Sequence, residues 1–141
     1  WVGTRFLAAV EANIHPDYLS HLLASSENDT AHFENLFDIG WPDAPHRALK
    51  NSTSKMWENA GRPDFGQRPG EGDVVASSAI GGSVLRYQSK SPSADLIGNV
   101  EATSMWAGQG VSMVKKVQPA HDIVRDIVDG AKVALERIVY L

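Results

Sequence analysis

The C-terminal quarter of the sequence most constrains what this chain can fold into, because it has the pattern of one long amphipathic helix. Pro119 suits the first turn of a helix, and apolar residues follow it at helical spacing on one face. They are Ile123, Val124, Ile127, Val128, Ala131, Leu135 and Ile138, and charged residues lie on the opposite face. A helix of this kind buries its apolar face against other structure. The remaining segments supply few strands to cover it, so we expect part of its packing partner to lie outside these residues.

The rest of the chain divides into short segments with distinct local signals. Pro16 starts a predicted helix with apolar residues at helical spacing, which ends before Ser25. A second helix is predicted over residues 45–60. Residues 61–73 contain four glycines and two prolines and are expected to form an irregular loop. Two β-like runs within residues 74–87, separated by a Gly-Gly pair, predict a small hairpin.

Composition and charge exclude several classes of function. The chain has 141 residues, a formal net charge of −4, and 13 basic residues that form no stripe, so a nucleic-acid partner is not expected. It has no cysteine, which excludes disulfides, thiolate zinc sites and cysteine nucleophiles and fits a cytoplasmic protein. No apolar run approaches the roughly 20 residues that span a bilayer. We therefore expect a cytoplasmic protein without a nucleic-acid or membrane partner.

The histidines do not predict a metal site or a hydrolase. None of them is spaced as metal ligands on a helix are, and no Gly-x-Ser-x-Gly turn accompanies them. We expect surface or capping roles and no metal for the five, which are His15, His21, His32, His46 and His121. Trp41, Trp57 and Trp106 are expected to be packing residues.

Two stretches carry residues suited to binding a ligand. The opening residues predict a short strand over residues 1–9. Gly3 would let an anion approach the backbone N–H groups, and the Thr4 hydroxyl would add a donor, as a phosphate requires. The second stretch is WAGQG, in which Gln109 lies between glycines and can reach the polar edge of a ligand. The alternative for Gly3-Thr4 is an ordinary end of a strand that leads into a loop. The alternative for WAGQG is an ordinary turn.

Taken together, these stretches resemble a known family. GTRFLAAVEANIHPDY near the start and MWAGQGVSMVKKVQPAHDIV near the end are similar to the C-terminal part of the nitronate monooxygenase family, formerly called 2-nitropropane dioxygenases. The resemblance includes the acidic-Ala pair Glu11-Ala12 and the intervening stretch APHRALKNSTSKMWENAG. It extends over nearly the whole chain.

The resemblance implies an α/β fold, namely the C-terminal part of an FMN-binding TIM (β/α)₈ barrel with an inserted small, mainly helical domain. Residues 1–12 would be the last barrel strand and the following loop. Residues 13–105 would form the inserted small α+β domain, and residues 106–141 would return to the barrel and form its C-terminal helix. A complete barrel needs about 250 residues. We therefore expect the missing N-terminal half of the same protein to be a partner of this chain.

The resemblance also implies an activity, the FMN-dependent oxidation of alkyl nitronates by molecular oxygen. Gly3 and Thr4 would lie at the FMN phosphate and Gln109 at the cofactor. Trp106, Ala107 and Gly108 would lie on the substrate side. The family's active-site histidine would lie outside this chain, so the isolated chain is expected to be inactive. The alternatives are a flavin-dependent enoyl or acyl-CoA reductase of the same fold, and a non-catalytic fragment or interaction module with a self-sufficient core.

Overall fold

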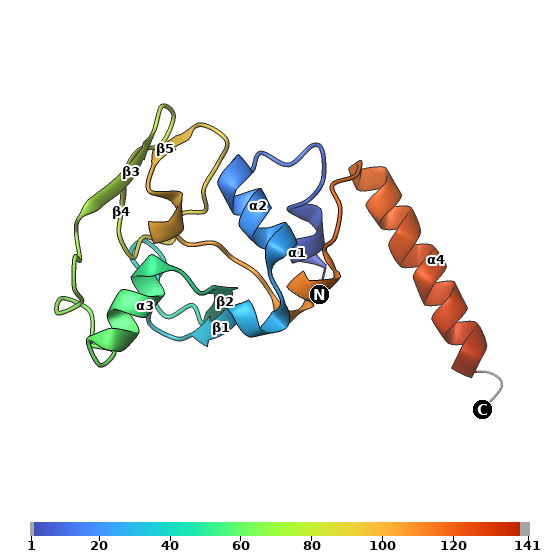
Figure 1. Ribbon diagram of the computed structural model, residues 1–141, viewed down its shortest axis with the longest axis horizontal. Coiled ribbons are helices and arrows are strands. Elements are labelled where there is room, and N and C mark those ends of the chain that lie inside the picture. The colour runs from blue at the N-terminus through green and yellow to red at the C-terminus, as the bar shows by residue number, and fades with distance from the viewer. Residues whose placement is uncertain (1, 139–141) are drawn as a thin grey trace.

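The computed structural model describes residues 2–138, which form small helices and sheets and one long C-terminal helix (Figure 1). The helices are α1 (Gly3–Phe6), α2 (Pro16–Ala24), α3 (Ser52–Asn59) and α4 (Ala120–Ile138). The strands are β1 (Thr30–Phe33), β2 (His46–Leu49), β3 (Val74–Ser78), β4 (Gly82–Leu85) and β5 (Leu96–Gly98). Short 3₁₀ turns are η1 (Glu27–Asp29), η2 (Val100–Ala102) and η3 (Gln109–Met113).

The strand predicted over residues 1–9 is wrong, because Gly3–Phe6 is the helix α1 and no described strand includes residues 2–9. Trp1 lies outside the described residues. The turn is local: the N–H of Arg5 donates to the carbonyl of Val2 at 3.0 Å. Backbone groups need a partner, and none of the five described strands pairs with residues 3–6. Without a neighbouring strand, hydrogen bonds within the segment satisfy its backbone.

The helix predicted to start at Pro16 is confirmed as α2. His15 caps it, since its Nδ1 accepts a hydrogen bond from the N–H of Asp17 at 3.1 Å. Tyr18 and Leu22 are buried on the inner face of the helix. α2 therefore contributes its apolar stripe to the larger of two cores.

The helix predicted over residues 45–60 is wrong in its first half, which forms β2 and pairs antiparallel with β1. Asn51 ends the strand and starts α3: its Oδ1 accepts from the N–H of Ser54 at 3.0 Å, and Ser54 Oγ accepts from the N–H of Asn51 at 2.8 Å. This reciprocal cap stops the helix from extending backwards. The segment expected to be mainly helical is therefore a mixture of helices and small sheets.

Two small antiparallel sheets organise this segment. One has the strand order β1-β2, and the main chain of Met105 and Ala107 extends it through hydrogen bonds of 2.8 and 3.1 Å to Leu49 and Arg47. The other has the order β4-β3-β5 and contains the hairpin predicted within residues 74–87, which is confirmed. The loop over residues 61–73 is irregular, as predicted.

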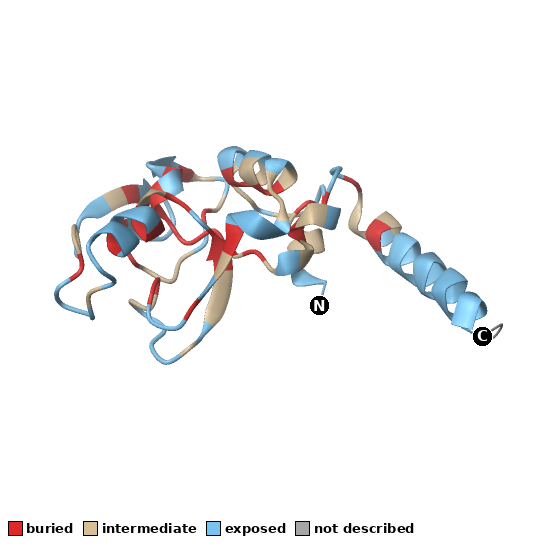
Figure 2. Cartoon of the chain, turned by 60° about the horizontal axis from the view of Figure 1, so that its bottom comes forward, coloured by how far each residue is buried: buried red, intermediate tan, exposed pale blue. Residues whose placement is uncertain are grey.

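The long C-terminal helix is confirmed as α4, and most of its apolar face is uncovered (Figures 1 and 2). Ile123 is buried at the start of the helix, whereas Val124 is 51% exposed, Ile127 40% and Val128 46%. Glu11 caps the helix, because its Oε2 accepts from the N–H of Ala120 at 2.9 Å. None of the helices within residues 2–138 combines the length and the hydropathy needed to cross a membrane.

Candidate functional site

The structure brings the two candidate stretches together. Thr4 Oγ1, on α1, accepts a hydrogen bond from the N–H of Gly108 at 2.9 Å. The main chain around them is joined as well, since the carbonyl of Gln118 accepts from Val10 at 3.1 Å and the carbonyl of Ala8 accepts from Gln118 at 3.2 Å. The beginning of the chain therefore lies beside the segment that precedes α4, and hydrogen bonds join the two.

Trp106 is held in place through its main chain. It forms an antiparallel bridge with Ala48 of β2. Its carbonyl oxygen accepts a hydrogen bond from the Tyr18 hydroxyl, and burial raises the pKa of Tyr18, so this hydroxyl remains a donor. Two elements distant in sequence, α2 and β2, thus fix the main chain at Trp106.

His46 packs against this indole, with ring centroids 4.2 Å apart. Its Nδ1 lies 2.9 Å from the carbonyl of Ala44, and because a carbonyl only accepts, Nδ1 carries the proton. Nε2 is then an acceptor, and it is buried with no hydrogen-bond partner within residues 2–138. Burial lowers the pKa of His46, so the ring is neutral near pH 7.

His46 does not occupy the surface or capping position predicted from the sequence. Its ring is part of an aromatic group that also includes Phe33, Phe37 and Trp106. Trp41 lies 5.8 Å from Trp106 between ring centroids and is 57% exposed, so it covers Trp106 without being a buried packing residue. Trp57, in contrast, is 6% exposed and packs as expected. Residues 46–49 (HRAL) do not alternate between polar and apolar residues, so the local sequence contains no signal that His46 belongs to a strand.

The remaining predicted site residues occupy different environments. Gly3 is exposed, and a Cβ built there would meet no heavy atom within 4 Å. Gln109 is exposed at the first position of η3. Ala107 is 2% exposed and belongs to the larger core, so its methyl group contacts protein atoms.

The residues at the Thr4–Gly108 contact suit one part of FMN, its phosphate. The open space at Gly3 allows an anion to approach the main chain. Because the Thr4 oxygen accepts from Gly108, its own hydroxyl proton remains available to donate. Gly3 and Thr4 therefore fit a phosphate group.

Comparisons with known proteins show that this chain is similar in fold to part of a solved structure. No protein-family model matches the sequence, and no curated protein sequence matches it. The structure of FabK from Thermotoga maritima aligns with a TM-score of 0.58 at 20% identity, covering 99% of this chain and 39% of FabK. A point mutant of FabK from the same organism aligns with a TM-score of 0.57 at 20% identity, covering 99% of this chain and 35% of that chain. The chain is thus a mixed α/β structure with the fold of part of FabK, and it spans less than two fifths of FabK's length.

Proposed function

We propose that this chain is the C-terminal portion of an FMN-dependent oxidoreductase. The observation that carries the proposal is the hydrogen bond from the Gly108 N–H to Thr4, which joins the two stretches that resemble the nitronate monooxygenase family. The fold shared with part of FabK supports the same proposal.

The uncovered face of α4 favours this proposal over a self-sufficient interaction module. Val124, Ile127 and Val128 are 40–51% exposed on one stripe. A stripe of this kind in a stable protein is covered by other structure. In the proposed enzyme, the N-terminal half of the same protein covers it.

Each group of residues has a separate part in the proposed site. Bound FMN supplies the electron acceptor. The Thr4 hydroxyl and the main chain at Gly3 hold the phosphate, where an anion is favoured by N–H donors. Trp106 offers an apolar surface on the substrate side, and the Gln109 amide offers a donor and an acceptor to the polar edge of the cofactor.

For the substrate we propose an alkyl nitronate, oxidised with molecular oxygen, on the strength of the sequence resemblance. The second candidate is the reduction of an enoyl or acyl-CoA thioester, which the likeness to FabK also fits. The two differ in the direction of electron flow. Turnover assays therefore distinguish them.

The phosphate contact is tested with Gly3→Asp in the intact protein that contains this chain. Gly3 is exposed at the start of a helix, where aspartate is well tolerated, so the variant is expected to fold. Its carboxylate would repel the phosphate, and FMN affinity should fall at least about tenfold while riboflavin affinity is unchanged. The control is Val10→Asp, because Val10 is 64% exposed and the same charge is added there.

If Gly3→Asp lowered the affinities for FMN and riboflavin equally, or lowered neither affinity, the result would contradict the proposed phosphate site. Absence of flavin binding by the unaltered protein would overturn the oxidoreductase proposal itself. With flavin bound, oxygen uptake in the presence of a nitronate supports nitronate oxidation. Reduction of an enoyl thioester by a nicotinamide nucleotide supports the second candidate.

A further inference from the structure

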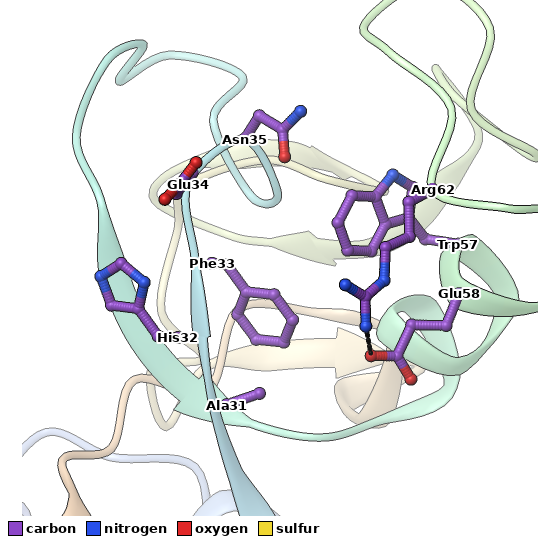
Figure 3. A pocket seen from close by; sticks show the side chains of 8 residues that line it. All are labelled: Ala31, His32, Phe33, Glu34, Asn35, Trp57, Glu58 and Arg62. Carbon is purple, nitrogen blue, oxygen red and sulfur yellow. Dashed lines mark hydrogen bonds and ion pairs between the residues drawn. The ribbon is translucent and has the colours of Figure 1, made fainter.

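A cleft of about 400 Å³ lies on the side of the molecule formed by β1 and α3 (Figure 3). One wall consists of five consecutive residues, 31–35, from β1 and its continuation. The other wall is formed by Trp57 and Glu58 of α3 and by Arg62 just beyond it. A strand thus runs along the length of the cleft, facing a helix.

The edge of β1 that does not face β2 presents main-chain groups that form no hydrogen bond within residues 2–138. In the antiparallel register Ala31 pairs with Ala48 and Phe33 with His46. The carbonyl of Arg47 and the N–H of Leu49 bond to the 105–107 segment, on the side of β2 that faces away from β1. The pairs Ala31–Ala48 and Phe33–His46 therefore form the hydrogen bonds between β1 and β2. The N–H and C=O groups of His32 therefore point away from β2.

Both ends of this edge are held rigidly. At one end, Thr30 Oγ1 donates to the carbonyl of Glu27 at 2.9 Å and accepts from Arg47 Nη1 at 3.0 Å. At the other end, the carbonyl of Asn35 accepts from Nη1 of the buried Arg68 at 3.1 Å. A ligand that binds along this edge meets a preformed surface.

The floor of the cleft is aromatic and its rim is charged. Phe33 and Trp57 are 3% and 6% exposed, with ring centroids 6.3 Å apart. Arg62 lies 5.7 Å from the Trp57 ring and pairs with Glu58 at 3.3 Å, so its charge is already balanced. Glu34 is exposed on the rim and forms no ion pair within the described part of the chain.

We infer that this cleft binds an extended peptide segment of a partner protein, which adds as a further strand to the edge of β1. Strand addition uses the main-chain groups of the edge for affinity and the side-chain pockets for specificity. A peptide residue opposite Phe33 shares its face and covers the small part of the Phe33 and Trp57 rings that remains exposed, so it is apolar. The residue opposite His32 lies on the other face, near the uncompensated Glu34, so it is basic. The expected motif alternates basic and apolar residues.

The probe is a fluorescent, end-capped peptide, Lys-Leu-Lys-Leu-Lys, into which the intact protein that contains this chain is titrated while fluorescence anisotropy is followed. Saturable binding is expected, and Glu34→Lys should weaken it at least about fivefold, as reversal of an exposed charge pair allows. The matched control is Glu136→Lys on the exposed part of α4, which changes the net charge equally. A control variant that weakens binding as much as Glu34→Lys would overturn the proposal, because the peptide would then bind the apolar face of α4 or the overall negative charge.

A second peptide tests the main-chain contacts. N-methylation of the central lysine removes the N–H that would donate to the carbonyl of His32, while charge and composition are kept. Loss of binding is expected from strand addition. An unchanged affinity of the N-methylated peptide would overturn the proposed strand addition. A failure of the unmethylated peptide to bind would overturn it as well. Neither peptide depends on flavin, so this test is independent of the proposed oxidoreductase activity.

Discussion

Thr4 accepts a hydrogen bond from the main-chain N–H of Gly108 at 2.9 Å, across 104 residues of sequence. The contact lies between α1 and the turn that precedes η3. A Cβ at residue 108 would lie 3.4 Å from Thr4 Oγ1, which is an ordinary van der Waals contact, so the hydrogen bond does not itself require glycine. Together with the main-chain bonds between residues 8–10 and Gln118, this bond links the beginning of the chain to the segment that leads into α4.

Replacement of Thr4 by valine should destabilise this contact. The N–H of Gly108 would lose its acceptor, and a hydrogen bond of this kind contributes about 1 kcal/mol. Thr4→Ser keeps the hydroxyl and should retain most of the stability. Urea unfolding of the two variants measures the difference, and equal stabilities would show that the bond contributes nothing.

Acidification should weaken the packing of His46 on Trp106. The pKa of His46 is lowered by burial, so the unfolded chain takes up the proton more readily than the folded one. The stability that depends on neutral His46 is therefore fully present above pH 6.5, the ordinary pKa, and is lost as the pH falls through the lowered value. Unfolding midpoints measured across this range should depend more steeply on pH in the original chain than in His46→Gln.

Arg68 should be the most sensitive charged residue of the loop over residues 61–73. Its side chain is fully buried and donates to Asp38 at 2.6 Å and, through Nε, to Glu71 at 3.1 Å. The guanidinium also lies 4.6 Å from the Tyr87 ring. Arg68→Met leaves the carboxylates of Asp38 and Glu71, whose side chains are 16% and 15% exposed, without their partner and should cost about 3–5 kcal/mol.

The matched control for Arg68→Met is Arg62→Met in the same loop. Arg62 is 65% exposed in its side chain and pairs with Glu58 at the surface, so its loss should cost less than about 1 kcal/mol. Both free energies come from chemical denaturation. Similar values for the two variants would contradict a structural role for the buried guanidinium.

Gly98 should not tolerate a side chain. Its φ is +133°, and a Cβ there would lie 2.7 Å from both Ala76 Cα and the carbonyl oxygen of Val75 in the adjacent strand. Gly98→Ala is expected to destabilise the chain by about 1–3 kcal/mol. Gly130→Ala, in open space within α4, should instead stabilise the helix by about 0.5–1 kcal/mol. Thermal unfolding should therefore shift in opposite directions for the two alanines.

Neighbouring residues of α4 should respond very differently to truncation. Ile123 is fully buried, and Ile123→Ala should cost about 2–4 kcal/mol. Val124 is 51% exposed, and Val124→Ala should leave the free energy of unfolding nearly unchanged in this chain. In the proposed intact enzyme, where the face is covered, Val124→Ala should become destabilising. A large effect of Val124→Ala in the isolated chain would show that its face is already packed.

Local signals in the sequence determined several elements by themselves. Pro16 and the apolar spacing after it predicted α2, the Gly81-Gly82 pair predicted the β3–β4 hairpin, and the periodicity after Pro119 predicted α4. In each case residues a few positions apart make the hydrogen bonds that define the element. The residue types of Gly3, Thr4 and Gln109 singled out the two candidate stretches, but the hydrogen bond that joins these stretches was not predicted from them.

Tertiary structure alone decided the elements whose backbone partners are distant. Residues 3–6 form a helix because no described strand pairs with them, and residues 46–49 form a strand because β1 does. The contact of His46 with Trp106 depends on the same non-local pairing, since β2 aligns the histidine beside the 105–107 segment. A sequence pattern indicates which conformations a segment can adopt. The neighbouring strand provides the hydrogen bonds and the burial that favour one of these conformations.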